Sequence, residues 1–344
     1  MRRTASLAVV AFGLLLFGCN PDTKNGTNQN PSNPGGGPKD VKIGFIVKSM
    51  ADSWFQSETS FAKEKAKELG AELIVQEALN GNAVLTTIDS MATNGCQGII
   101  ICSPEVQLGS AIKAAAARHD MKLMSVDDRL VGGDGKPLTD IPHLGIDAYN
   151  IGKQVGQAIV DEMGRRGWKP DEVAGLAITA PALETARQRV NGAKEVLLAN
   201  GFRESNIFEA PWTGSVDIAA ASDAANGVLT ARSHFRKWVV FSSNDDGVLG
   251  GIRAISNRGI PATGIIGVGI NGALAAAEWA KGTPTGMVAS VLLQPRVHGA
   301  DTVEMMYRWI TEGKEPPKET YTTGTIIDKN NYKEALKKQG LSLP

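Results

Sequence analysis

From Val41 onward, short runs of β-branched and aliphatic residues alternate with longer amphipathic stretches. Such runs are typical of buried strands, and the stretches between them repeat their apolar residues at helical spacing. The alternation predicts an α/β protein with parallel sheets and helices on both faces of each sheet. In the first part of the chain, strands are predicted at 41–48, 72–76, 98–102 and 122–127, and helices at 54–69, 83–94 and 108–119.

A second series of the same kind begins near His143. Two half-chains with similar alternation indicate two similar lobes, and such lobes usually meet at a ligand-binding cleft. The predicted strands are 143–145, 175–179, 207–209, 238–242, 265–269 and 287–291, and the predicted helices are 149–166, 185–200, 218–231, 247–257, 273–281 and 296–312.

The first forty residues do not follow this pattern. Residues 1–18 carry Arg2 and Arg3 before a short apolar run, which predicts a secretory signal peptide. The run ends in LFGC, which resembles a bacterial lipobox and makes Cys19 a candidate for lipidation, although an ordinary signal peptide is the alternative. The rest of 19–40 is rich in Asn, Pro and Gly, so we expect a flexible linker between the lipidated Cys19 and a folded domain at 41–344.

Charge and cysteine content exclude several classes of function. The chain has 36 basic and 36 acidic residues, so nothing favours a nucleic-acid partner. Besides Cys19, only Cys96 and Cys102 are present, and neither has metal-like spacing. The four histidines show no paired ligand spacing either, so the sequence predicts neither a metal site nor a cofactor.

Several predicted strands end in polar residues that a buried sheet does not need. Any one of them could be a helix N-cap, because Asp, Asn and Thr are the preferred caps. Together, and next to the aromatic pair Trp54 and Phe55, they favour a ligand site at the carboxyl ends of the strands. Aromatic rings beside charged groups suit a sugar, whose C–H faces lie on rings while its hydroxyls pair with polar groups. The polar strand ends are Lys48, Asp127, Asp128, Thr179, Asn244, Asp245, Asp246 and Asn271.

The motifs of common enzymes are absent from the sequence. The first strand is followed by KSMADSW rather than GxGxxG, and neither a phosphate loop nor a GxSxG elbow occurs. Asp127 and Asp128 are adjacent at a strand end, so their side chains should point in opposite directions and cannot form a facing acid–base pair. The sequence therefore predicts a binding protein and not an enzyme.

Many segments of the folded part resemble the periplasmic sugar-binding proteins of ABC importers, above all the arabinose-binding members of that family. The resemblance implies the type I binding-protein fold, with two Rossmann-like lobes joined by a three-segment hinge. It corrects the division into two successive halves, because the last third of the chain would be shared: an N-lobe of about 41–146 and 293–322, and a C-lobe of about 147–292 and 323–344. The segments that carry it include VKIGFIVK, SWFQ, IDSMATNGCQGIIICSP, DMKLMSVDD, ETARQR, SNDDGVLGGIRA and IIGVGING.

The resemblance also implies the ligand site, residue by residue. Trp54 and Phe55 would make the apolar sugar contacts, and the polar contacts would come from Lys48, Asp128, Arg189, Asn244 and Asn271. Two alternatives stay open, because Arg189 could be a solvated helix charge and Trp54 could be a core residue. The secondary site residues are Asp52, Cys102, Asp127, Ile146, Leu183, Thr185 and Ser243.

Three of these positions depart from the family pattern. Asp52 stands where arabinose-binding members have a longer glutamate, so a direct sugar contact there would become water-mediated. Ser243 and Ile146 each replace a methionine, and the serine leaves room for a larger sugar or a water. The resemblance favours L-arabinose, with galactose or another aldose as the alternative.

The function implied is that of a monomeric, lipid-anchored solute-binding protein on the periplasmic or cell-surface side of a membrane. It would capture a monosaccharide and deliver it to the permease of an ABC importer, with Cys19 as the membrane attachment. A sensory binding protein that reports the sugar to a membrane receptor is the alternative, since it would use the same pocket residues.

Overall fold

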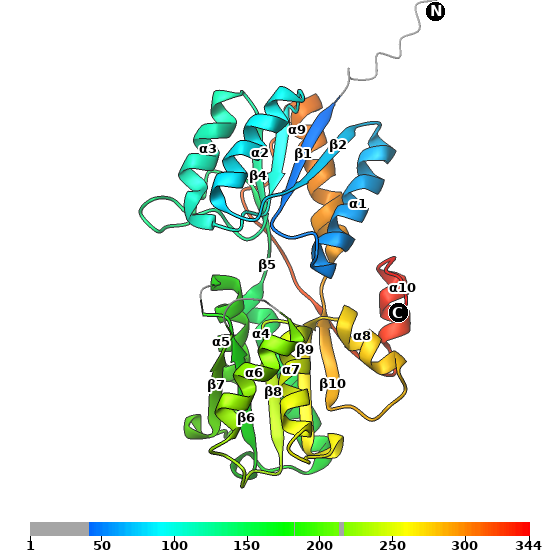
Figure 1. Ribbon diagram of the computed structural model, residues 1–344. Helices are drawn as coiled ribbons and strands as arrows, with labels where there is room; N and C mark the ends of the chain where they lie inside the picture. Colours follow the sequence, from blue (N-terminus) through cyan, green and yellow to red (C-terminus); the bar gives the residue numbers. More distant parts are fainter. Residues whose placement is uncertain (1–40, 182, 213–216) are drawn as a thin grey trace, which may run out of the picture. The chain divides into compact units, whose positions relative to one another are not determined.

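The computed structural model describes residues 41–181, 183–212 and 217–344, which form two six-stranded sheets flanked by helices (Figure 1). The predicted signal peptide, Cys19 and the linker up to residue 40 lie outside the described residues. The predicted fold class, α/β with two parallel-sheet lobes, is confirmed. Among the described residues, no helix combines the length and apolar character needed to cross a bilayer.

The first sheet is entirely parallel and has the strand order β11-β5-β4-β3-β1-β2. The helices that cover it are coloured blue, cyan and orange in Figure 1. Its strands are β1 (Lys42–Val47), β2 (Glu72–Glu77), β3 (Gly98–Ile101), β4 (Lys122–Asp127), β5 (His143–Ile146) and β11 (Thr320–Thr322), and its helices are α1 (Ser53–Leu69), α2 (Gly81–Thr93), α3 (Gly109–Arg118) and α9 (Thr302–Glu312).

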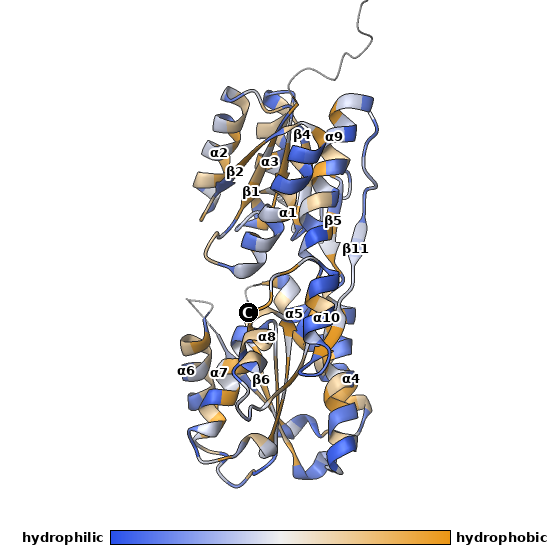
Figure 2. Ribbon diagram, turned by 90° about the vertical axis from the view of Figure 1, so that its right-hand side faces the viewer, coloured by the Kyte–Doolittle hydropathy of each residue, from blue (hydrophilic) through white to orange (hydrophobic). Residues whose placement is uncertain are grey.

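Strand β1 is buried on both faces, as expected for a central strand of a parallel sheet. Ile43, Phe45 and Val47 belong to one core cluster, together with residues of α1 and α9. Ile46 belongs to a second cluster, formed with α2 and α3. Because side chains alternate along a strand, one apolar run supplies both cores. Figure 2 shows the same contrast, with orange strands and much blue on the helices.

The second sheet has the order β12-β10-β9-β8-β6-β7, and only β12 is antiparallel to its neighbour. Its strands are β6 (Ala174–Thr179), β7 (Ile207–Pro211), β8 (Trp238–Ser242), β9 (Ile265–Asn271), β10 (Met287–Leu292) and β12 (Thr325–Asp328), and its helices are α4 (Ala148–Arg166), α5 (Glu184–Ala199), α6 (Ile218–Leu229), α7 (Asp245–Ser256), α8 (Ala273–Ala280) and α10 (Tyr332–Lys338). Short 3₁₀ turns lie at Val106–Leu108, Pro170–Glu172, Glu204–Asn206 and Ala262–Gly264, and a π-helical turn lies at Val297–Asp301.

Helices α4 and α5 pack closely because three glycines lie at their contact. A side chain at Gly152 would come within 2.0 Å of the Arg189 carbonyl oxygen, and one at Gly192 within 2.2 Å of the Tyr149 carbonyl oxygen. Gly156 fits in the same way against Ala193. The close approach fixes the height of Arg189 on α5 relative to the sheet beneath.

The chain passes between the two sheets at three places: after β5, after β10 and after β11. The linear pattern alone put the predicted strand near His143 in the second series, but β5 pairs with β4 in the first sheet. That position is the one implied by the resemblance, whose N-lobe runs to about residue 146. Strands β11 and β12 and helix α10 were not predicted. Two of them are short strands at sheet edges, where few residues alternate long enough to give a periodic signal.

Candidate functional site

Helix α1 begins directly after the first polar strand end. Asp52 is its N-cap, and its side chain accepts a hydrogen bond from the Trp54 backbone N–H at 2.8 Å. The cap fixes the first turn, and Trp54 and Phe55 are then buried with 8% and 4% of their surfaces exposed. Asp52 itself is exposed, so its carboxylate already has a structural partner at the start of the helix.

Lys48 and Asp128 form an ion pair between the ends of β1 and β4. Both side chains are partly buried, at 27% and 16% exposed. Burial alone would lower the pKa of Lys48, but the Asp128 carboxylate outweighs it and raises that pKa. Burial likewise opposes ionisation of Asp128, yet Lys48 and Thr185 hold its pKa below the ordinary value. Both groups are therefore charged at neutral pH.

Asp127 and Asp128 point to different partners, as predicted. Asp127 Oδ1 accepts from Trp54 Nε1 at 3.2 Å and lies 2.7 Å from His298 Nδ1. The backbone at Asp127 has a φ of 61°, a left-handed conformation in which aspartate is one of the few tolerated side chains. This turn sends one carboxylate beneath Trp54 and leaves the other with Lys48.

Trp54 lies both in the core and at the polar cluster. Its ring meets His298 edge-on, with centroids 5.1 Å apart and an interplanar angle of 76°. The Phe55 ring centroid lies 5.9 Å from Lys48 Nζ. Cys102, at the end of β3, is fully buried, and its thiol lies 3.8 Å from Asp128 Oδ2. Burial raises the pKa of the Cys102 thiol, which stays protonated.

In the second sheet, backbone N–H groups hold the polar side chains of Asn244 and Asp245. Asn244 is the N-cap of α7, and its Oδ1 accepts from the Gly247 N–H at 3.1 Å. Asn271 ends β9 with a φ of 106°, a strained conformation for a residue with a side chain. Asp245 lies between these two positions and accepts from the Gly272 and Ala275 N–H groups at 2.9 and 3.1 Å.

Arg189 is not a freely solvated helix charge. Its Nη1 donates to the Ser243 carbonyl oxygen at 2.7 Å, and its Nε is buried without a hydrogen-bond partner among the residues that the structure describes. Burial lowers the pKa of the guanidinium below its ordinary value, against the pull of Asp128. Thr185, one turn earlier on α5, donates to Asp128 Oδ1 at 3.0 Å. That hydrogen bond joins helix α5 to the strand end of the first sheet.

Two of the predicted secondary residues lie at the margin of this cluster. Leu183 precedes α5 and is 43% exposed, two residues before Thr185. Ile146 is 9% exposed at the end of β5, where it pairs with Thr322 of β11. The cluster thus gathers the polar residues Lys48, Asp127, Asp128, Thr185 and Arg189 with Cys102, Trp54 and Phe55, while Asn244, Asn271 and Ser243 lie at the strand ends of the second sheet.

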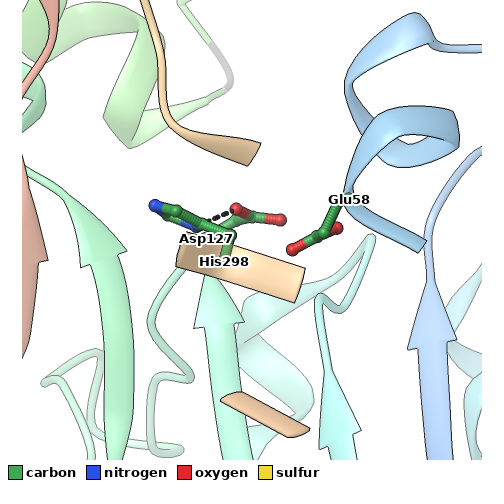
Figure 3. Close-up of side chains that lie close together, drawn as sticks. All are labelled: Glu58, Asp127 and His298. Atoms are coloured by element: carbon green, nitrogen blue, oxygen red, sulfur yellow. Dashed lines mark hydrogen bonds and ion pairs between the residues drawn. The ribbon is translucent and has the colours of Figure 1, made fainter. Parts of the chain in front are cut away.

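Two buried residues next to the cluster, Glu58 and His298, were not predicted, and both lie beside the predicted Asp127. Glu58, Asp127 and His298 offer ligand atoms that all lie within 4.8 Å of one another, and Figure 3 shows the side chains converging from α1, β4 and the turn after β10. His298 Nε2 lies 2.8 Å from Thr322 Oγ1. Glu58 gives no signal in sequence beyond its position one turn after Trp54, and His298 is 171 residues from its partner.

A hollow of about 820 Å³ opens elsewhere on the second sheet. It is lined by residues near the ends of α4 and α8 and the starts of β9 and β10, among them Arg166, Trp168, Thr263 and Met287. None of the predicted ligand residues lines it. Because parallel sheets place ligands at the carboxyl ends of their strands, we assign the site to the polar cluster and not to this hollow.

Comparison with known proteins identifies the family of the chain. Residues 40–335 match the family described as periplasmic binding proteins and sugar binding domain of LacI family. The chain is 44% identical to an ABC transporter L-arabinose-binding periplasmic protein of Azospirillum brasilense, over 88% of this chain and 90% of that protein. It is 43% identical to the L-arabinose-binding periplasmic protein of Escherichia coli K12, over 88% and 92%. The crystal structure of a galactofuranose binding protein superposes with a TM-score of 0.72 at 21% identity, covering 87% of this chain and 98% of that one, and supports the fold.

Proposed function

The chain belongs to the periplasmic sugar-binding proteins, and from this premise we propose that it binds L-arabinose and delivers it to an ABC importer. The family is one of binding proteins, in agreement with the prediction that the chain is not an enzyme. Both L-arabinose-binding relatives match almost the whole folded chain at more than 40% identity, which favours this pentose over other aldoses.

The observation that carries the proposal is the chain of contacts from Lys48 through Asp128 to Thr185. It brings a cation, a carboxylate and a hydroxyl together beside the rings of Trp54 and Phe55. A sugar hydroxyl both donates and accepts, so it can exchange partners with each of these groups. A pyranose ring would lie on Trp54 while its hydroxyls bond to Lys48 and Asp128.

The second sheet would supply neutral and cationic donors to the other side of the sugar. Arg189 has a buried Nε with no partner in the described part of the chain, and a guanidinium presents a planar fork to two neighbouring oxygens. Asn244 uses Oδ1 for its cap, which leaves the Nδ2 group for a hydroxyl. A ligand held from both sheets would stabilise the closed arrangement of the lobes over the open one by its differential affinity.

Calorimetry and thermal shift with a panel of L-arabinose, D-galactose, D-xylose and D-ribose test the proposal. A ligand that binds only the folded state raises the apparent stability, by about 2.7 kcal/mol at a hundredfold excess over Kd. We expect the largest rise with L-arabinose. A larger rise with D-galactose would reassign the ligand and point to the smaller Ser243 side chain, whereas no rise with any aldose would contradict the sugar-binding proposal. In the matched variant Ser243→Met, any rise in stability caused by hexoses should be smaller than in the wild type.

We further propose that Cys19 is acylated and tethers the folded domain to a membrane. The lipobox-like LFGC and the polar linker that follows support this assignment. A Cys19→Ser variant should move from the membrane fraction to the soluble fraction. Equal partition of both forms, with no lipid mass on the amino-terminal peptide, would rule the anchor out.

A further inference from the structure

Glu58 on α1 is a carboxyl group sealed inside the protein. It is 0% exposed, and neither of its carboxyl oxygens has a hydrogen-bond partner among the described residues. The helix is pressed against the π-helical turn Val297–Asp301, where a side chain at Gly299 would come within 2.0 Å of the Glu58 carbonyl oxygen. An isolated buried carboxylate is costly, so this group must be neutralised or paired.

The carboxyl group opposite Glu58 is that of Asp127, and it too has a buried oxygen without a hydrogen-bond partner among the described residues. Asp127 Oδ1 is used by Trp54 and His298, whereas Asp127 Oδ2 is buried without a partner in the described part of the chain. The ligand atoms of Glu58, Asp127 and His298 all lie within 4.8 Å of one another (Figure 3). Two carboxyl groups, each with an unpaired oxygen, thus face each other inside the core.

A proton or a metal cation could join the two groups. The imidazole of His298 is already engaged at both nitrogens, Nδ1 by Asp127 and Nε2 by Thr322 Oγ1. A metal would therefore need to displace one of these bonds to gain a nitrogen ligand. One proton pairs an oxygen of Glu58 with Asp127 Oδ2 and leaves every other contact in place.

We propose that Glu58 is protonated in the folded protein and donates a hydrogen bond to Asp127, which positions that carboxylate beneath Trp54. The role in sugar binding rests on the proposed function of the cluster. Glu58 is a positioning residue, because it acts on Trp54 through Asp127. The same network extends through His298 to Thr322, the last residue of β11, where the chain passes to the second sheet.

The electrostatic surroundings support a protonated Glu58. Burial raises the pKa of its carboxyl group most, Asp127 raises it further, and Asp52 adds to the effect, whereas Lys48 lowers it. Other ionisable groups near it include Cys102, held as a thiol, Asp128, held as a carboxylate, and His298. The π-helical turn also carries Asp301, whose pKa burial raises, and Lys65 of α1 pairs with Glu68 and with Glu304 of α9. His143 on β5 is neutral in the relevant range, because burial lowers its pKa to about 4.

The sign of the resulting pH dependence follows from linkage. Between the ordinary glutamate pKa of about 4.3 and the raised pKa of the folded state, the folded protein binds more protons than the unfolded chain. The stabilisation associated with this proton is complete at low pH and is lost as the pH rises through the raised pKa. At a pH above this raised pKa, Glu58 and Asp127 repel each other, and the Trp54 side chain should become more mobile.

Paired variants at Glu58 test the inference. A Glu58→Gln side chain can still donate to Asp127 but cannot ionise, whereas Glu58→Leu fills the volume without donating. We expect Glu58→Leu to bind L-arabinose about tenfold more weakly than Glu58→Gln, since a hydrogen bond to a charged acceptor is lost. Between about pH 5 and 9, the thermal midpoint of the wild type should fall relative to that of Glu58→Gln. The control is Glu68→Gln on the same helix, whose side chain is 67% exposed and which should follow the wild type.

Three outcomes would overturn the inference or separate it from the proposed function. Parallel midpoint profiles for the wild type and Glu58→Gln, also in a His298→Gln background that removes the imidazole, would mean that Glu58 carries no proton. A midpoint of the chelator-treated protein that rises with Zn²⁺, Mn²⁺ or Ca²⁺ in the wild type but not in Glu58→Gln would identify a metal instead. A wild type that binds no aldose would refute the proposed function, while the midpoint profiles would still decide the state of Glu58.

Discussion

At the ends of β1 and β4 the polar side chains contact one another, whereas at the ends of β8 and β9 they mainly contact the backbone. In the first sheet, Lys48 pairs with Asp128, and Asp127 is shared between Trp54 and His298. In the second, Asp245 binds two backbone N–H groups and the Ser290 hydroxyl, at 2.7 Å for the latter. The first group joins side chains of opposite charge, whereas the second is made mainly to backbone N–H groups, by a carboxyl group whose pKa burial raises to about 7.

The difference indicates how each sheet would meet a ligand. Side chains paired with one another can exchange a partner for a sugar hydroxyl without disturbing the backbone. Side chains that cap a helix or a turn are already fixed, and they present their remaining donors in a set direction. We therefore expect the first sheet to adjust on binding and the second to act as a rigid template.

The largest effect is expected from Trp54→Ala, because this side chain serves both the core and the site. Loss of a buried tryptophan costs about 3–5 kcal/mol of unfolding free energy. L-Arabinose affinity should fall at least about 30-fold, as for the central residue of a binding surface. Chemical denaturation and calorimetry measure the two quantities separately. Trp54→Phe keeps a ring and should retain much of the stability. If Trp54→Ala binds L-arabinose with the affinity of the wild type, Trp54 is not part of the site.

Asp245→Ala should be the next most severe change, and it tests the rigid template. It leaves two backbone N–H groups and one hydroxyl unpaired in the core, at about 1–3 kcal/mol each if none finds water. We expect about 3 kcal/mol of destabilisation and weaker sugar binding, since the turn after Asn271 would lose its anchor. Asp245→Asn keeps an acceptor, so its stability should lie between those of the wild type and Asp245→Ala. A thermal midpoint equal to wild type in Asp245→Ala would show that the turn holds itself.

Lys48→Met examines the charge dependence of the first sheet. Removing the cation leaves Asp128 partly buried without its ion-pair partner and held by Thr185, which we expect to cost about 2 kcal/mol at neutral pH, less than for a fully buried pair. The folded pKa of Asp128 is lowered, so the pair stabilises the protein above the unfolded carboxyl pKa of about 3.9 and loses this contribution as the pH falls through the folded value. The difference in unfolding free energy between wild type and variant, measured by denaturant titration, should therefore become smaller as the pH is lowered. A gap that widens in acid would contradict the assigned charges.

Thr185→Val should have the smallest effect, since it removes the one bond from α5 to Asp128 while Lys48 still pairs with that carboxylate. The expected loss is about 1 kcal/mol, the net contribution of an ordinary hydrogen bond. Thr93→Val is the matched control, because Thr93 makes only an exposed bond within its own helix. If both variants shift the thermal midpoint equally, the bond between Thr185 and Asp128 contributes nothing specific.

Local patterns in the sequence were enough to predict most of the fold. The strand of β1 and the helix of α1 follow from alternating and helical spacing, and the polar residues at strand ends follow from the rule that ligands meet parallel sheets there. The short strands β11 and β12 were not predicted, because three or four residues are too few to show a reliable period. The linear pattern put β5 in the second series for a related reason, since the period of one strand does not encode its pairing partners. The resemblance to the family, with an N-lobe of about 41–146, put it in the first.

The sequence by itself determined the α/β class, the aromatic and polar side chains of the candidate site, and the absence of enzyme motifs. Each of these depends on residue type and near-neighbour spacing. Only the tertiary structure brought Glu58, Asp127 and His298 together and joined Thr185 to Asp128. Those contacts connect residues far apart in the chain, and whether a carboxyl group is buried beside another depends on packing, which no local pattern reports.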